Sequence, residues 1–228
     1  MWSNLVIVGA VGGITAMDTT AGPQWMISRP IVTGAVLGAL LGDVSVGILF
    51  GTLLELIWIG AIPVGGSELL DINEAGVVAT ATAVYLVHRY GMPRPDAVLW
   101  TLLYVPLVGL VGLKFTGVVR KWNGYLAHRA DGVAQRGDLS RISLYHLCGA
   151  GFSFGRGSIL SIGGVVLGIT LIPRIHALFP PMDPSVLTGV TFALIGLGAA
   201  ALLNFFWIRP LILYLLMGLG AGMLLRLL

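Results

Sequence analysis

The chain has 228 residues, of which 57% are hydrophobic and only 10% are charged. Its mean hydropathy is +0.94, and this leaves too little polar surface to cover a 24.0 kDa globule in water, since ordinary soluble domains are about 25% charged. The composition excludes a soluble enzyme and predicts an integral membrane protein. The formal net charge is +3, but most Lys and Arg residues fall between apolar stretches, where they orient membrane proteins, so no nucleic-acid partner is expected.

Charge-poor runs predict about seven to nine apolar segments in an all-α, polytopic membrane domain that covers residues 1–228. The first run, 1–17, is expected to be a retained helix, because it has neither a basic start nor a cleavage site. Runs 19–41 and 67–88 are expected to be re-entrant or broken helices buried against protein. A full crossing needs about 20 apolar residues, and four ranges fit one: 44–64, 97–119, 185–206 and 211–225.

Residues 120–141 form the one clearly hydrophilic stretch, with five Lys or Arg against two Asp. By the positive-inside rule we expect a basic cytoplasmic loop here, with residues 88–96 on the opposite side. The single cysteine, Cys148, excludes an internal disulfide, and we expect it to be a buried apolar residue. Glycines at four-residue spacing predict close helix packing: Gly34, Gly38 and Gly42, then Gly47 and Gly51.

A polar break separates the first two apolar runs. Asp18 and Arg29 bracket the sequence TTAGPQWMIS, which contains Gln24 and Ser28. The Gly-Pro pair and the flanking charges are typical of a discontinuous helix whose ends face a polar ligand, and the amide and hydroxyl suit a ligand that carries hydroxyl groups. An ordinary loop at the membrane surface is the alternative.

Glu55 lies within a long apolar run, ILFGTLLELIWIGAIPVGG, where a carboxylate is costly. Trp58 follows three residues later on the same helical face. A carboxylate beside an aromatic ring can hold a sugar, because the acid accepts hydroxyl hydrogen bonds and the ring offers an apolar face. The alternative is an ion pair, or a protonated Glu55 that fixes helix packing.

Further acidic residues lie at segment boundaries. Asp43 is expected to cap a helix N-terminus. Glu68, Asp71 and Glu74 recur at every third residue and could cap a helix, line a polar cavity or, least favoured, ligate a cation. No ATP-binding, nucleophile or zinc motif occurs, so no catalytic residue, metal or cofactor is expected. Four scattered histidines are expected to be interfacial or packing residues: His88, His128, His146 and His176.

The region from about Gly9 to Gly65 resembles the membrane IIC subunit of the mannose/fructose/sorbose family of the bacterial phosphoenolpyruvate-dependent sugar phosphotransferase system. The resemblance depends on the combination and order of several short elements, and it continues as a compatible hydropathy pattern. These elements are Asp18, Gln24, Ser28–Pro30, Leu41–Asp43, Gly47, Gly51, Leu54–Glu55, Trp58, Gly60 and Pro63–Gly65.

The resemblance implies a sugar permease subunit in the bacterial inner membrane, which translocates a hexose as partners phosphorylate it. It implies a IID membrane partner, cytosolic IIA/IIB phosphocarriers, a trimeric assembly in lipid and elevator-like movement, with no phosphorylation site on this chain. A small-solute carrier or membrane scaffold without phosphoryl transfer is the alternative function. Seven residues are the candidate sugar-binding positions: Asp18, Gln24, Ser28, Arg29, Glu55, Trp58 and Asp71.

The chain departs from the family pattern after Gly65. Family members continue with small residues and a Pro-Asp or Pro-Pro-Asp sequence, whereas this chain reads GSELLD from Gly66 to Asp71. Asp71 occupies the place of the family aspartate, but the prolines are missing. The identity of the sugar, and a regulatory or altered role for this copy, are therefore left open.

Overall fold

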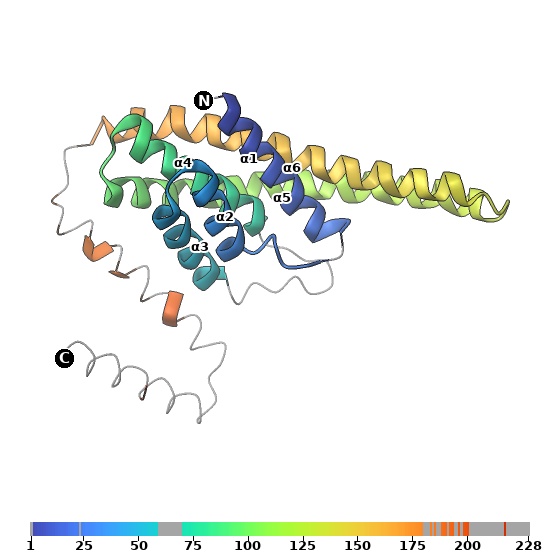
Figure 1. The fold of residues 1–228 in the computed structure, drawn as a ribbon, viewed down its shortest axis with the longest axis horizontal. Coiled ribbons are helices and arrows are strands. Elements are labelled where there is room, and N and C mark those ends of the chain that lie inside the picture. The colour runs from blue at the N-terminus through green and yellow to red at the C-terminus, as the bar shows by residue number, and fades with distance from the viewer. Residues whose placement is uncertain are drawn as a thin grey trace.

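A computed structural model describes residues 2–22, 24–58 and 70–179, together with scattered positions between 183 and 217. The described residues up to 179 form six helices and no strand (Figure 1), so the all-α prediction is confirmed for this part of the chain. The expected segments 185–206 and 211–225 fall largely outside the described residues. The helices are α1 (Trp2–Thr20), α2 (Pro30–Leu41), α3 (Val44–Trp58), α4 (Ile72–Tyr90), α5 (Arg94–Ala134) and α6 (Leu139–His176).

Helix α4 lies at the centre of the fold and contacts each of the other five helices. Every residue from Glu74 to Leu86 is buried. This stretch is rich in Ala, Val and Thr, which are small enough to allow neighbouring helices to approach on all sides. The run 67–88, expected to be a broken helix, therefore contains one continuous helix from Ile72 onward, and its burial against protein is confirmed.

Helices α2 and α3 form a short hairpin that packs against α4. The glycine spacing predicted close packing, and the structure confirms it: a Cβ added at Gly34 would lie 2.6 Å from the carbonyl oxygen of Gly47, and one at Gly38 only 2.8 Å from the Cα of Gly47. Gly42 was wrongly included in this contact. It ends α2 with φ 90°, a left-handed conformation that favours glycine, and a Cβ added there would meet none of the described atoms within 4 Å.

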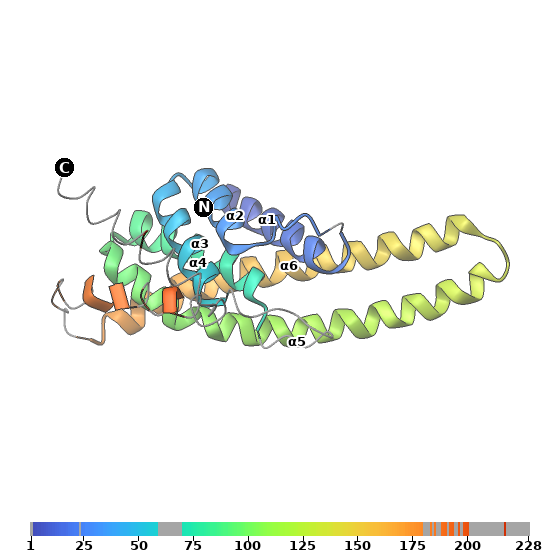
Figure 2. The ribbon, with the colours of Figure 1, turned by 90° about the horizontal axis from the view of Figure 1, so that it is seen from below.

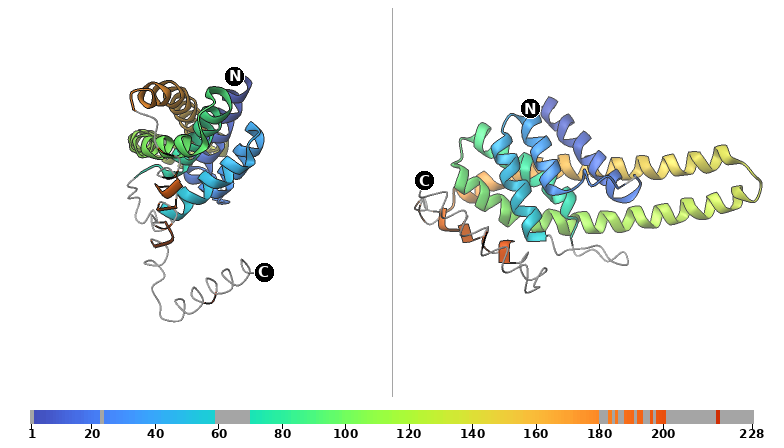
Figure 3. Two further views of the ribbon diagram at one scale, coloured as in Figure 1. Left: turned by 90° about the vertical axis from the view of Figure 1, so that its left-hand side faces the viewer. Right: turned by 60° about the horizontal axis from the view of Figure 1, so that its bottom comes forward.

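Helices α5 and α6 run side by side and project as a long hairpin beyond the other helices (Figure 2; Figure 3). The expectation of a loop at 120–141 was wrong, because most of these residues are helical: α5 continues to Ala134 and α6 begins at Leu139. The intervening sequence has Lys, Arg, Ala and Leu residues that favour helix, and the chain reverses only at Gly137, which has φ 70°. Asp138 then caps α6 by accepting the N–H of Arg141 at 3.1 Å.

The hairpin is longer than a bilayer. Helix α5 has 41 residues, roughly 60 Å at 1.5 Å per residue, about twice the thickness of the hydrocarbon core. Of the described helices, α5 and α6 are long and apolar enough to cross a membrane. Cys148 lies on α6 and is exposed, so the expectation that it is buried was wrong. The neighbouring Leu147 is 65% exposed as well, because none of the described helices covers this side of α6.

Candidate functional site

The polar break between α1 and α2 is folded around the carboxylate of Asp18. Its two oxygens accept the backbone N–H of Trp25 at 2.8 Å and that of Ser28 at 3.0 Å. Asp18 is 4% exposed and Ser28 is 5% exposed. Gln24 adopts φ 55°, an unusual conformation for a residue with a side chain, and its side chain is exposed. Asp18 therefore holds the break in place from its buried side, whereas Gln24 lies on the exposed side of the break.

Arg29 and Glu55 form an ion pair between the break and α3. Arg29 is the N-cap residue of α2, and the second Glu55 oxygen lies 3.4 Å from the backbone N–H of Ile31. One expected alternative, that an ion pair offsets the cost of Glu55, is thus present in the structure. The Arg29 side chain is 42% exposed, against 13% for Glu55, so the pair is accessible from its guanidinium side.

Two candidate sugar-binding residues remain, Trp58 and Asp71, and each has a structural role. Trp58 lies at the end of α3 and is partly buried against an apolar cluster that includes Phe50 and Leu54. It therefore contributes to packing on at least one side of its ring. Asp71 is 7% exposed and caps α4 by accepting the N–H of Glu74 at 3.3 Å. Glu68, the third acid of the expected cluster, lies outside the described residues.

Asp71 belongs to a buried polar cluster that connects α4, α5 and α6. Arg156 on α6 forms an ion pair with Asp71 and donates to Thr116 Oγ1 at 2.7 Å. Thr116 on α5 lies 3.3 Å from the same Asp71 oxygen. The side chains of Arg156 and Asp71 are 3% and 8% exposed. Because both charges are removed from solvent, each depends on the other for its stability in this environment.

Glu74 extends the cluster to α1. It is fully buried, lies 3.0 Å from Thr15 Oγ1 and accepts the hydroxyl of Ser161 at 2.6 Å. Thr15 and Ser161 were not identified from the sequence, because isolated hydroxyl residues in apolar helices carry no distinctive signal. Arg156 was also missed, although a signal existed: it is the only residue among Asp, Glu, Lys and Arg between Arg141 and Arg174.

Asp43 caps α3, as expected, by accepting the N–H of Val46 at 3.0 Å. Its second oxygen faces His88 Nε2 at 2.8 Å and Arg94 Nη2 at 3.2 Å. His176 similarly lies 3.1 Å from Asp96. These two histidines hold helix ends together. In the described parts of the chain, no three His, Cys, Asp or Glu side chains are grouped as metal ligands.

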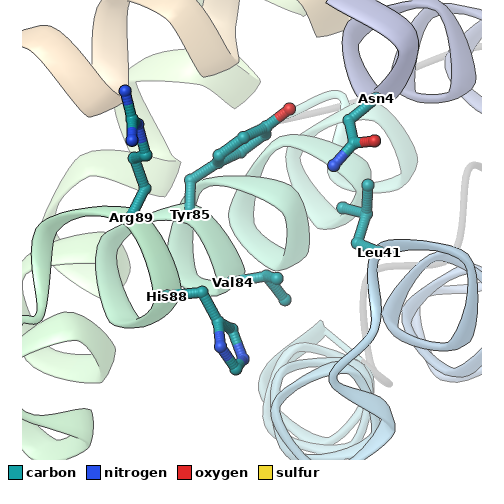
Figure 4. Close-up of a pocket in the computed structure, with 6 residues that line it drawn as sticks. All are labelled: Asn4, Leu41, Val84, Tyr85, His88 and Arg89. Atoms are coloured by element: carbon teal, nitrogen blue, oxygen red, sulfur yellow. The ribbon is translucent and has the colours of Figure 1, made fainter. Parts of the chain in front are cut away.

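A cavity of about 420 Å³ lies at the opposite end of the helices from the polar break. Figure 4 shows Asn4 of α1 and Leu41 of α2 facing the last turns of α4. Along α1, Asn4 and Asp18 are separated by roughly 20 Å at 1.5 Å per residue. The cavity is therefore distinct from the candidate sugar-binding residues. Its lining consists of Asn4, Leu41, Val84, Tyr85, His88 and Arg89.

Several characterised proteins are similar to this chain. A fructose permease IIC component of Bacillus subtilis (strain 168) is 28% identical over 143 residues, 63% of this chain and 49% of that protein. A mannose-specific EIIC component of Escherichia coli (strain K12) is 27% identical, with 63% of this chain and 50% of that protein covered. A sorbose-specific EIIC component of Klebsiella pneumoniae is 23% identical, with coverage of 87% and 72%. The chain thus spans about half the length of the first two relatives.

Two solved structures share the fold. One, described as the structure of a membrane protein, has a TM-score of 0.67 and 20% identity, with 97% of this chain and 87% of that chain covered. The other is the mannose transporter ManYZ in complex with microcin E492, with a TM-score of 0.59, 20% identity and coverage of 97% and 86%. The family model of the PTS system sorbose-specific IIC component matches residues 2–227, and the chain therefore belongs to this family of membrane proteins.

Proposed function

We propose that this chain is the IIC sugar permease subunit of a mannose-family phosphotransferase system and translocates a hexose that partner subunits phosphorylate. The family match over residues 2–227 carries the proposal. The relatives are named for fructose, mannose and sorbose, which are all hexoses with several hydroxyl groups. A polar break beside a carboxylate and an arginine is chemically suited to such a substrate, since both charged groups form strong hydrogen bonds with hydroxyls.

The sugar-contacting residues in this proposal surround the Arg29–Glu55 pair. The pair is open on the Arg29 side, so a sugar hydroxyl could bridge the guanidinium and the carboxylate without separating them. Gln24 supplies an exposed amide on the same break. Trp58, at the end of α3, completes the set. Ser28 is buried and supports the site through its backbone N–H, which binds Asp18.

Asp18 and Asp71 have a supporting role in the same proposal. Both oxygens of Asp18 accept backbone N–H groups, which leaves the carboxylate to position the break that carries Gln24 and Arg29. Asp71 is occupied by Arg156 and Thr116 and is buried. Substitutions of these two residues should therefore change sugar binding through the shape of the protein.

The proposed assembly is a multi-pass complex in the bacterial inner membrane. Its partners are a IID membrane subunit, supported by the fold shared with ManYZ, and cytosolic IIA/IIB proteins that supply the phosphoryl group. The chain would pass the membrane several times, associate as a trimer and carry the sugar by elevator-like movement of one part against another. The basic tip of the α5–α6 hairpin would face the cytoplasm.

Vectorial phosphorylation tests this function directly. Membrane vesicles that contain the IID partner and this chain, supplied with IIA/IIB and a phosphoryl donor, should accumulate hexose phosphate. Omission of this chain should abolish the accumulation, and vesicles with an inactive IIB protein provide the control for passive entry. Uptake of an unmodified solute by this chain alone would contradict the proposal and indicate a carrier without phosphoryl transfer.

A further inference from the structure

Three helices meet around the carboxyl group of Glu74, which no part of the proposed sugar site uses. Its oxygens contact Thr15 on α1 and Ser161 on α6, and Glu74 itself lies in the first turn of α4. The backbones are in close contact here: a Cβ added at Gly157 would lie 2.2 Å from the carbonyl oxygen of Gly12 and 2.8 Å from Glu74 Oε1. The carboxyl group is therefore enclosed by protein atoms.

The charges in this region do not balance if every acid is ionised. Asp71 and Glu74 are two carboxyl groups, and among the described residues Arg156 is the positively charged group that acts on Glu74. Arg156 directs its ion pair to Asp71, and its buried Nε atom has no hydrogen-bond partner in the described part of the chain. No ion pair within the described residues involves Glu74. An ionised Glu74 would be a buried carboxylate without its own counter-charge, which is strongly unfavourable.

The hydrogen-bond distances offer an arrangement that removes the imbalance. Thr15 Oγ1 lies 2.8 Å from the carbonyl oxygen of Gly12, which can only accept, and 3.0 Å from Glu74 Oε1. A hydroxyl has a single hydrogen, so Thr15 can donate to one of these oxygens only. If it donates to Gly12, Glu74 must be the donor to Thr15, whereas Ser161 donates to the other Glu74 oxygen at 2.6 Å.

We propose that Glu74 is a proton-binding site: at neutral pH it is a neutral acid whose proton is donated to Thr15 Oγ1. A chain of hydrogen bonds then runs from Ser161 through Glu74 and Thr15 to Gly12, and it joins α6, α4 and α1. Because Glu74 is then neutral, the negative charge of Asp71 and the positive charge of Arg156 cancel each other. This inference is independent of the proposed transport function and holds if the chain carries another solute.

Infrared spectroscopy of the purified full chain in lipid tests the assignment. The C=O stretch of a protonated carboxylic acid is separate from the carboxylate bands, so the wild type at neutral pH should show it. Glu74→Gln should abolish this band, because glutamine keeps the shape and hydrogen bonds but has no carboxyl group. Glu55→Gln is the matched control and should leave the band unchanged, since Glu55 is paired with Arg29.

A wild-type spectrum without the band, or a band that survives Glu74→Gln, would overturn the proposal. If the band depends on sodium concentration in the buffer, a monovalent cation takes the place of the proton, and the proposal is also wrong. Should Glu74→Gln yield no folded protein, Thr15→Val supplies the second test. It removes the acceptor of the Glu74 proton and should shift the band, and an unshifted band would contradict the assigned donor.

Discussion

Arg29 and Glu55 are joined by an ion pair, although 26 residues separate them in the chain. The pair fixes the end of the polar break to the last turn of α3. Helix α2 begins directly after Arg29, and its first turn approaches the same carboxylate through the N–H of Ile31. A ligand that binds to this pair would therefore contact the break and the α2–α3 hairpin together.

Glu55→Gln should weaken sugar binding while leaving the folded complex intact. Loss of a hydrogen bond to a charged group costs about 1.5–3 kcal/mol, about tenfold or more in dissociation constant. The yield should be preserved because a partly exposed ion pair contributes only about 0–1 kcal/mol to stability. The measurement is sugar affinity beside the yield of detergent-extracted complex, with Trp58→Phe compared in parallel. Reduced yield with normal affinity in the surviving complexes would assign Glu55 to packing alone.

Asp18→Ala should disorder the break, because two backbone N–H groups lose their acceptor at a cost of about 1–3 kcal/mol each. Asp18→Asn retains one acceptor oxygen and should have a smaller effect. Limited proteolysis within residues 21–29 measures the disorder, and sugar affinity should fall in the same order. Asp131→Asn, on the exposed hairpin, is the control. Equal protection of Asp18→Ala and the wild type would show that the carboxylate does not shape the break.

Gly47→Ala should destabilise the α2–α3 hairpin. The added Cβ would lie 2.2 Å from the carbonyl oxygen of Gly34 and 2.7 Å from the Cα of Gly38, and both are backbone atoms that cannot rotate away. Overpacking of this kind costs about 1–3 kcal/mol. Thermal unfolding in detergent should show a lower midpoint. Gly117→Ala on α5, where the added Cβ meets open space, should maintain or raise the midpoint, because alanine favours helix by about 1 kcal/mol.

Arg156→Met should cause a large loss of folded protein, since it leaves the Asp71 carboxylate buried without a counter-charge. Removal of one partner of a buried pair costs about 3–5 kcal/mol. The double variant Arg156→Met/Asp71→Asn should recover much of the yield, because asparagine is neutral and remains a good helix cap. Fluorescence-detected size exclusion of the extracted protein measures both. A double variant no better than Arg156→Met would refute the charge explanation.

The tip of the α5–α6 hairpin should be cytoplasmic. In a Cys148→Ser background, Gln135→Cys places one thiol in the turn that follows α5. A membrane-impermeant maleimide should label it in inverted vesicles but not in intact cells. The background protein without the added thiol is the control for non-specific labelling. Labelling of intact cells would reverse the proposed orientation.

The membrane class, the polar break and the Asp43 cap could be predicted from the sequence because they depend on local properties. Hydropathy is a property of composition, and a cap joins a side chain to a backbone group three residues away. The sequence also predicted that the glycines of α2 and α3 would pack closely against another helix, because four-residue spacing places small residues on one helical face. The family resemblance, based on the order of such elements, is confirmed by the family match.

The partners of the buried charges were decided only by the tertiary structure. Arg156 and Asp71 are 85 residues apart, and Glu74 is 87 residues from Ser161. Only the packing of α4 against α5 and α6 brings these groups together. The basic segment was mistaken for a loop for a related reason: hydrophilic composition excludes burial in lipid, but it does not exclude a helix that continues beyond the bilayer. Local sequence determined where charges could be tolerated, whereas helix packing determined which charges meet.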